Sequence, residues 1–398
     1  MHTLAGERGT APQPPAAVRP RFFFTQVKAL RGTPTGELLE GMTEAPFRRL
    51  QELKLEGQRG ALSLAEVRDV WLPREAPALA TADLLVCSEP FWLCPLVAAR
   101  REGWMLGVLH MALLNELPFT DAENLSAFWA DFYAMADRSN VLLSVACRLT
   151  GEQVLHQTGV SVPYVPFLGL HVAARHNPGP ARQALLFRNN RQHMVAFRGA
   201  LRLFVEEIDP PFPVSIVDMN EAPRALSFEE IASFHAVVLL PHGPNALRLS
   251  DLYAAAVPMV VPGEPLVHKF IWASRTFGGY DADGHYRARA PEALRRRPQN
   301  ASHPPFSPFN FLQAWSIHRL IDDRRYWYGY TEWATLPHIQ RFRSLPELLQ
   351  VLEALTPEEA RAVSVRMAQH HLVMAADALG WWRAALGELL AHAGDGEA

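Results

Sequence analysis

Short apolar runs alternate with amphipathic stretches along the first half of the chain. The runs that predict strands are residues 21–27, 84–87, 105–110, 141–146 and the proline-interrupted 162–168, and helices are expected at 36–53, 125–136 and 152–157. Runs that stay apolar throughout are typical of strands that are buried on both faces of a parallel sheet. Strands and helices in alternation therefore predict a parallel sheet covered by helices.

A break in this alternation falls at residues 173–182, where Asn177-Pro178-Gly179-Pro180 can continue neither a helix nor a strand. The alternation then restarts, with strands expected at 184–187, 214–217, 236–240 and 259–261, helices at 193–207, 227–232 and 247–256, and closing helices at 344–354, 357–375 and 379–391. Ser227 and Glu230 have the spacing of a capping box at the start of one helix. The restarted pattern predicts an α/β protein with two Rossmann-like domains.

The same pattern divides the 398 residues into four parts. Residues 1–20 are rich in Pro, Ala and Gly and are expected to form a disordered tail. Residues 21–175 form the predicted N-terminal domain, 182–345 the C-terminal domain, and 346–398 the closing helices. This length exceeds one typical hydrophobic core and fits two domains of ordinary size.

Composition narrows the class of protein. The net charge of −3 gives no electrostatic case for binding nucleic acid or an anionic membrane. The three cysteines, at 87, 94 and 147, contain no CxxC pair and indicate buried free thiols of a reducing compartment, with neither a disulfide framework nor a zinc site. No apolar run approaches the roughly 20 residues of a membrane-spanning helix, and no secretory signal is recognisable near the start. A cytoplasmic location is therefore expected, or the Golgi if the chain is incomplete; the sequons at Asn124 and Asn300 mean little without an export signal.

Residues 235–262 (HAVVLLPHGPNALRLSDLYAAAVPMVVP) carry the clearest functional pattern. They predict a buried strand, a loop, a helix opened by Asn245 and stopped by Pro258, and a second strand. Such a unit presents a helix N-terminus and polar side chains at the carboxyl end of a parallel sheet, where phosphates and ribose hydroxyls bind.

This block resembles the donor-nucleotide motif of GT-B glycosyltransferases. In members with two acidic residues here, the second binds the ribose hydroxyls, and Asp251 matches that position. The first would fall at Gly243 and is therefore absent, which leaves open whether the anomeric configuration is retained or inverted. The block can also be an ordinary strand–helix–strand crossover without a ligand.

The resemblance implies two domains that face each other across a cleft, with C-terminal helices that cross back to the first domain. It also implies a donor site in the second domain. GT-B enzymes often place an Arg and a Lys after the first strand of this domain, and here Arg188 and Arg191 follow that strand. Without a metal, these cations would neutralise the leaving nucleoside diphosphate, so no cofactor is expected. His242 and Asn245 would lie beside the phosphates or the transferred sugar. The alternative for both arginines is an ordinary charged surface loop.

Acceptor chemistry needs a group that accepts a proton, and the first domain offers three. Glu89 follows the strand at 84–87, and His110 and Glu116 follow the strand at 105–110. Cleft residues are expected beyond the carboxyl ends of such strands, and His is the commonest base near neutral pH. A single His at a strand end is also often structural.

Two polar or aromatic segments remain. Residues 281–285 (DADGH) have no recognised ligand spacing, so we interpret them as a polar turn of an irregular insertion rather than a metal site. Residues 324–330 (RRYWYGY) and 336–339 (LPHI) are similar to a segment of exostosin-like GT-B sequences. We interpret these aromatics as a small core between the domains; alternatively, one or two line the cleft and stack on a sugar or base.

Together these features lead to two hypotheses. The first is a glycosyltransferase that moves a sugar from a nucleotide diphosphate donor to a glycan, protein or small-molecule acceptor. The second is an inactive GT-B-like protein that binds glycan or nucleotide, because an acidic residue is missing at Gly243 and no base is indisputable. A nucleotide-sugar epimerase or a similar double-Rossmann enzyme is a weaker third option.

Overall fold

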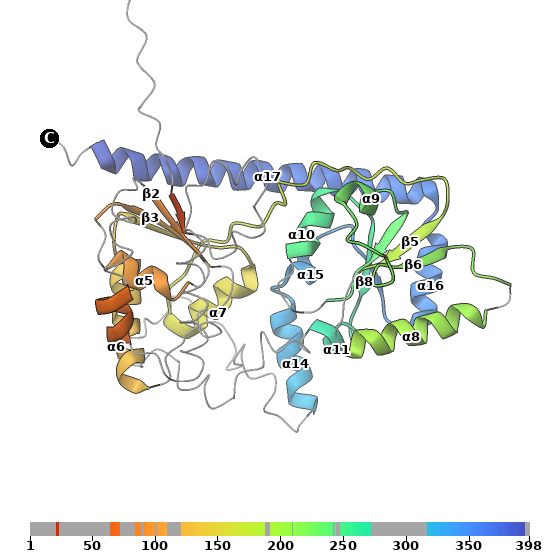
Figure 1. Ribbon diagram of the computed structural model, residues 1–398, viewed down its shortest axis with the longest axis horizontal. Coiled ribbons are helices and arrows are strands. Elements are labelled where there is room, and N and C mark those ends of the chain that lie inside the picture. Colours follow the sequence, from red (N-terminus) through yellow and green to blue (C-terminus); the bar gives the residue numbers. More distant parts are fainter. Residues whose placement is uncertain are drawn as a thin grey trace, which may run out of the picture.

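The computed structural model describes eleven stretches of the chain. These are residues 21–23, 64–71, 84–88, 91–99, 102–109, 121–187, 192–208, 210–241, 243, 247–271 and 317–394. The expected tail at 1–20, the helix at 36–53 and the insertion around 281–285 lie outside them. Within the described residues the protein is α/β, with two sheets of parallel strands (Figure 1).

The first sheet confirms four of the five strands predicted in the first half, although residues 24–27 of the first lie outside the described residues. It contains β1 (Arg21–Phe23), β2 (Leu84–Cys87), β3 (Trp104–Leu109) and β4 (Val141–Val145), in the order β1-β2-β3-β4. All neighbouring pairs are parallel. The last three residues of β2 are buried, as expected for an apolar run within a parallel sheet.

Helices cover the first sheet on one side. These are α5 (Leu93–Ala98), which the sequence analysis missed, and α6 (Ala122–Ala136), with α7 (Arg148–Thr158) following β4. Because the strands follow one another in spatial order, right-handed crossovers place α5 and α6 on the same face (Figure 1). Phe128, Trp129 and Phe132 of α6 are fully buried in this first core. The short α3 (Leu64–Glu66) and the π-helical turn η2 (Val67–Trp71) add Leu64 and Val67 to it.

The strand predicted at 162–168 is wrong. This segment makes only one bridge to the first sheet, between Val145 and Tyr164. The Val145 amide donates to Pro163 O and the Val165 amide donates to Val145 O, each at 2.8 Å. Prolines at 163 and 166 have no amide hydrogen, so the ladder cannot continue in either direction.

The second sheet has a reversed strand order. It contains β5 (Gln183–Leu186), β6 (Ser215–Asp218), β7 (Ala236–Val238), β8 (Met259–Pro262) and β9 (Gln340–Phe342), in the order β6-β5-β7-β8-β9. The chain first extends the sheet from β5 to β6 and then returns to the other side of β5 with β7. The sequence predicted the first four of these strands and missed β9.

The reversal places helices on both faces of the second sheet. The helices are α8 (Gln192–Glu206), α9 (Phe228–Ala232), α10 (Leu247–Ala254), α11 (His268–Ile271), α14 (Ile317–Tyr328), α15 (Glu332–Thr335) and α16 (Leu345–Ala354). Figure 1 shows α8 and α16 on one side and α9 and α10 on the other. The capping box at Ser227 and Glu230 is confirmed, since each side chain accepts a hydrogen bond from the other residue's backbone amide.

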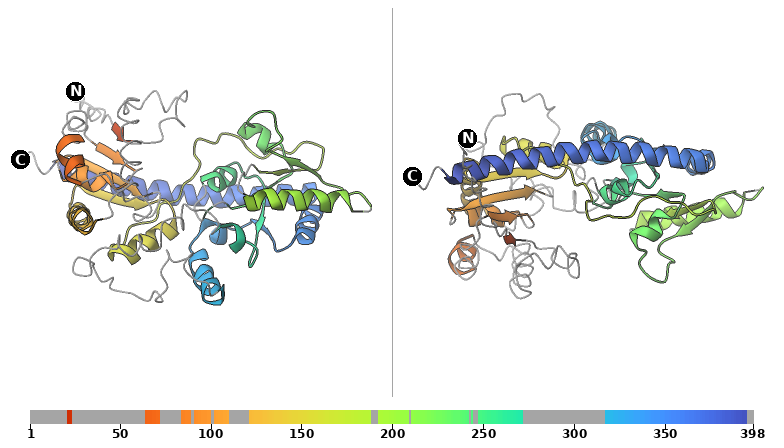
Figure 2. Two further views of the ribbon diagram at one scale, coloured as in Figure 1. Left: turned by 60° about the horizontal axis from the view of Figure 1, so that its bottom comes forward. Right: turned by 90° about the horizontal axis from the view of Figure 1, so that it is seen from above.

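One long helix closes the fold. The two helices predicted at 357–375 and 379–391 are one continuous helix of 38 residues, α17 (Pro357–Gly394). No proline interrupts it, and Gly380 is tolerated inside a helix at a cost of about 1 kcal/mol. It runs past both sheets (Figures 1 and 2). Ala360, Val363 and Met367 belong to the core of the second sheet, whereas Ala378 packs with Val165 and Leu168.

The cysteines also differ from expectation. Cys87 and Cys94 form a disulfide, while Cys147 is a buried free thiol. Cys87 ends β2, and the chain then turns into α5, so that Cys94 lies 5.8 Å from it between Cα atoms. This turn could not be seen from the seven-residue spacing. The inference of a reducing compartment rested on three free thiols and loses its basis.

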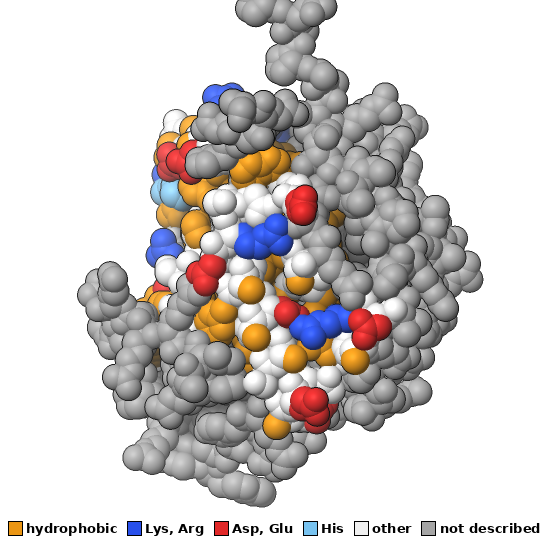
Figure 3. Space-filling view, turned by 90° about the vertical axis from the view of Figure 1, so that its left-hand side faces the viewer, with side chains coloured by type: hydrophobic (Ala, Val, Ile, Leu, Met, Phe, Trp, Pro, Cys, Tyr) orange, Lys and Arg blue, Asp and Glu red, His pale blue; other side chains and the backbone are white. Residues whose placement is uncertain are grey.

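The described surface has no large patch of one charge in the view of Figure 3, in agreement with the small net charge of the chain. On the face formed by the first-sheet end of the molecule, acidic and basic side chains are interspersed among apolar ones (Figure 3). None of the described helices is long and apolar enough to cross a membrane.

Candidate functional site

Most of the predicted site residues lie outside the described part of the chain. These are Glu89, His110, Glu116, Arg188, Arg191, His242 and Asn245. The strands that precede them in the sequence are described, and they are β2, β3, β5 and β7. The roles of these seven residues therefore stay predictions, while the strand ends that lead to them are known.

The end of β5 lies beside the end of β7 at the reversal of the second sheet. The Phe187 amide, one residue beyond β5, donates to Val238 O at 3.0 Å, so the two strands remain paired to their carboxyl ends. Beyond β7, Gly243 O accepts a hydrogen bond from the Trp333 indole Nε1 at 3.1 Å. In doubly wound sheets the crevice at such a reversal, outside the carboxyl ends, is where ligands bind.

Asp251 lies in the second turn of its helix. The helix α10 begins at Leu247, as predicted, so Asp251 is its fifth residue. Its side chain is 11% exposed, and its oxygens lie 3.4 Å from His171 Nε2 and 3.3 Å from Arg248 Nη1. Burial raises the pKa of this carboxyl, and the charges of Arg248 and His171 oppose that rise. His171 belongs to the connection between the two sheets, so Asp251 contacts that connection.

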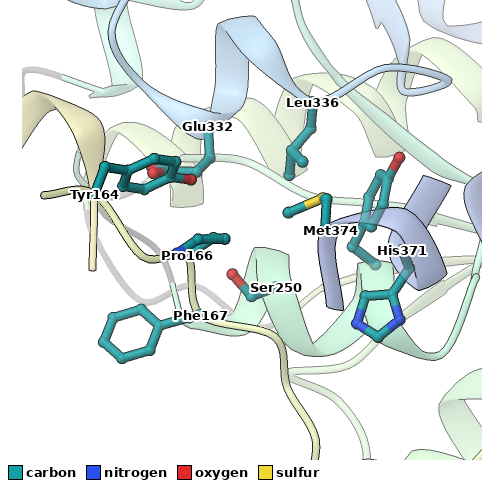
Figure 4. A pocket seen from close by; sticks show the side chains of 9 residues that line it. Tyr164, Pro166, Phe167, Ser250, Glu332, Leu336, His371 and Met374 are labelled. Carbon is teal, nitrogen blue, oxygen red and sulfur yellow. The ribbon is translucent and has the colours of Figure 1, made fainter. Parts of the chain in front are cut away.

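A buried carboxylate that the sequence analysis missed links the short helix α15 to a residue that follows β4, the last strand of the first sheet. Glu332 is the first residue of α15, and its Oε2 accepts a hydrogen bond from the Cys147 thiol at 3.1 Å. Cys147 follows the carboxyl end of β4 and precedes α7, and it packs in the core of the second sheet. The Tyr164 hydroxyl points toward the same carboxylate (Figure 4). Glu332 thus joins the second sheet's helices to the carboxyl edge of the first sheet.

The environment of Glu332 favours its neutral form. Burial raises the pKa of the Glu332 carboxyl, although hydrogen bonds from Cys147, from the Arg148 amide and from Tyr164 act in the opposite direction. Burial also raises the pKa of the Cys147 thiol and of the Tyr164 hydroxyl, and the negative charge of Glu332 adds to both shifts. The Glu332 Oε1 atom is buried and has no hydrogen-bond partner among the described residues.

A small pocket adjoins this carboxylate (Figure 4). Its lining comes from the connection after α7, from α10, from α15 with its following residue and from α17: Tyr164, Pro166, Phe167, Ser250, Tyr253, Glu332, Leu336, His371 and Met374. Its free volume is about 10 Å³, which holds roughly one water molecule. In this conformation the pocket is too small for a sugar ring.

The aromatic block, which covers the end of α14 and the residues that lead to β9, packs in the core. Trp327, Tyr328 and Trp333 are buried in the core of the second sheet, together with Leu336 and Ile339. This confirms the packing role expected for these aromatics, although the core they join is the main one of the second sheet. The signal for Glu332 was present here, because a lone carboxylate sits within a strongly apolar and aromatic stretch.

No protein-family model matches the chain, and no curated protein matches it. Among the described residues, no group of three or more His, Cys, Asp or Glu side chains could hold a metal ion. The case for function therefore depends on the strand order, on the residues that follow the strands, and on the contacts of α15.

Proposed function

We propose that this chain is a GT-B glycosyltransferase that moves a sugar from a nucleotide diphosphate donor to a glycan, protein or small-molecule acceptor. The observation that carries the proposal is the strand reversal between β5 and β7. A phosphate- and ribose-bearing ligand binds at such a reversal in doubly wound sheets. In the sequence, Arg188 and Arg191 follow β5, which ends at Leu186, and His242 and Asn245 follow β7, which ends at Val238.

A second observation agrees with a two-domain enzyme. Cys147, beyond the carboxyl end of β4, contacts Glu332, and the neighbouring Trp333 contacts Gly243 beyond the carboxyl end of β7. Two consecutive residues of α15 therefore connect the carboxyl edges of both sheets. A GT-B enzyme needs these edges to meet, because donor and acceptor bind between them. The domain limits near 175, 182 and 345 are part of this proposal.

The chemistry would use charged side chains to bind the leaving group. Arg188 and Arg191 would meet the negative charge that develops on the nucleoside diphosphate as the bond to the sugar breaks. The proton of the acceptor hydroxyl would pass to a base, for which Glu89, His110 and Glu116 are the candidates in the first domain.

One observation favours the second candidate function, a nucleotide- or glycan-binding protein without activity. Gly243 occupies the position of the first acidic residue, and the Asp251 carboxylate already contacts His171 and Arg248. A protein with this arrangement could hold a nucleotide without catalysing transfer.

A panel of nucleoside diphosphates tested by thermal shift examines the proposal. One of them should raise the melting temperature, since a ligand at one hundred times its Kd adds about 2.7 kcal/mol of stability. Arg188→Ala or Arg191→Ala should weaken its binding by about 1.5–3 kcal/mol, the value of a charge-assisted hydrogen bond. Arg202→Ala, at an exposed position of α8 where the arginine pairs with Glu221, is the matched control.

Donor hydrolysis then separates the two candidate functions. Slow release of sugar from the matching nucleotide sugar supports the transferase, and binding without release supports the inactive protein. If none of the nucleoside diphosphates changes the melting temperature, the transferase and the nucleotide-binding protein both fail, and only glycan binding without a nucleotide is left to test.

A further inference from the structure

The contacts of Glu332 cross from one half of the protein to the other. We call the described residues up to Val165 the first half and those from Gln183 to Ala354 the second half. Glu332 belongs to the second half, through α15. Its carboxylate partners Cys147, the Arg148 amide and Tyr164 all come from the chain of the first half, and the Cys147 side chain reaches from there into the core of the second sheet. Tyr164 is joined to that half by its bridge with Val145.

The same short helix holds the loop that follows β7. Trp333, the next residue, is buried and donates its indole hydrogen to Gly243 O at 3.1 Å. If Glu332 shifts, Trp333 should shift with it, and so should the loop after β7 that Trp333 contacts. This arrangement couples the position of the first half to the crevice of the second sheet.

The neutral and ionised forms of the Glu332 carboxyl differ in how well they fit a buried site. Its neutral form suits the low-polarity site, where Oε1 lies buried beside a pocket with room for about one water molecule. Its ionised form places a negative charge there. The groups that face the site are Cys147, Arg148 and Tyr164 in the first half, Tyr253 on α10 and His371 on α17. Of these, His371 already contacts Leu168 O at 2.7 Å, and the Tyr253 hydroxyl donates to Pro337 O at 3.2 Å.

We propose that Glu332 is a proton-operated latch between the two halves: when neutral it holds the first half against α15, and when ionised it releases it. An ionised carboxylate that stays buried loses hydration, and separation of the halves restores that hydration. A cation of the first half lies close by, since the Arg148 guanidinium is 5.6 Å from the centroid of the Tyr164 ring. The proposal uses only the contacts of Glu332 and does not depend on transferase activity.

The direction of the pH effect follows from the site. Burial raises the pKa of Glu332 above its ordinary value of 4.5. Its stabilising contribution is therefore complete below about pH 4.5 and is lost as the pH rises through the raised value. The latched state is therefore favoured when the pH is below the raised pKa of Glu332, and the released state is favoured when the pH is above it.

A distance measurement between the halves tests the latch. Spin labels at Ala130→Cys on α6 and Ala200→Cys on α8 use exposed positions, while Cys147 is buried and Cys87 and Cys94 are paired. Pulsed electron resonance is recorded from about pH 5 to about pH 9. We expect the distance distribution to broaden and shift as the pH rises. In Glu332→Gln, which keeps the shape but cannot ionise, it should stay at the low-pH form throughout.

Two further variants make the test independent of a single substitution. Tyr164→Phe removes a donor that favours the ionised carboxylate, so the midpoint of the transition should move to higher pH. Glu207→Gln, which removes a charge at an exposed position, should behave like the wild type. A wild-type distance that is unchanged across the range, a Glu332→Gln variant that still responds, or an unmoved midpoint in Tyr164→Phe would each overturn the proposal. Circular dichroism verifies that each variant is folded.

Discussion

Trp333 and Gly243 are 90 residues apart in the sequence, yet the indole of one donates to the backbone carbonyl of the other at 3.1 Å. Trp333 is 1% exposed, so this hydrogen bond is made in the absence of water. Gly243 lies in the loop after β7, between the predicted donor residues His242 and Asn245. A core tryptophan thus fixes one point of the loop that the proposed function needs.

Trp333→Phe should therefore affect both stability and nucleotide binding. The substitution keeps an aromatic ring but leaves the Gly243 carbonyl without this donor, which costs about 1–3 kcal/mol for a buried group. Urea unfolding should show this loss, and titration calorimetry should show weaker binding of the matching nucleoside diphosphate. Leu372→Ala, at an exposed position of α17, is the control and should change neither by more than about 0.5 kcal/mol. Unchanged nucleotide affinity in Trp333→Phe would show that the position of the Gly243 loop does not affect nucleotide binding.

Gly169 should resist substitution because of both its backbone and its surroundings. Its φ is +56°, and a Cβ there would meet Ala254 Cβ and Ser250 O at 3.1 Å and Asp251 Cα at 3.2 Å. Gly169→Ala should lower the free energy of unfolding by about 1–2 kcal/mol from the left-handed conformation, with a further loss from the contacts with α10. Gly179→Ala lies in the same connection with nothing within 4 Å and should be nearly neutral. Equal effects of the two changes would contradict the close packing at Gly169.

The disulfide predicts a measurable contribution to stability. Replacing Cys87 and Cys94 together by Ser opens a short loop, and the chain-entropy model assigns such a loop about 2–3 kcal/mol. The double variant and the reduced wild type should therefore unfold at similar urea concentrations, both below the oxidised wild type. Intact mass after alkylation gives the direct check, since one free thiol should be modified without a reductant and three with it under denaturing conditions.

The sequence predicted the strands well and the long-range contacts poorly, for physical reasons. Apolar runs such as 84–87 and 236–240 are enough to predict buried parallel strands, because a strand between two layers needs apolar residues on both faces. The reversal of strand order between β5 and β7 cannot be predicted from any single segment, because it depends on which strands pair with each other. The predicted strand at 162–168 failed because its apolar content was right but its prolines prevent a ladder.

Glu332 shows the same limit at the level of the site. Its partners Cys147 and Tyr164 are 185 and 168 residues away, so only the fold brings them together. The sequence marked its neighbours as core aromatics, and a lone acidic residue among them was the available clue. Asp251 was recognised by its motif, but its pairing with His171 depends on how the connection between the sheets lies against α10.

Asp251→Asn tests the part of the donor site that the structure describes. If Asp251 binds ribose hydroxyls, the amide should weaken nucleoside diphosphate binding, because an ionised carboxylate accepts both hydroxyl hydrogens and an amide offers one acceptor oxygen. If it serves only His171 and Arg248, binding should be unchanged. The loss of stability should then be at most about 1 kcal/mol, since those partners are 64% and 48% exposed. Titration calorimetry and urea unfolding of both proteins distinguish the roles.

Arg248→Gln is the companion variant, because it breaks one ion pair and leaves the carboxylate in place. Lower affinity in Asp251→Asn with normal affinity in Arg248→Gln would place the carboxylate on the ligand; equal affinities in all three proteins would remove the strongest residue-level argument for the proposed donor site.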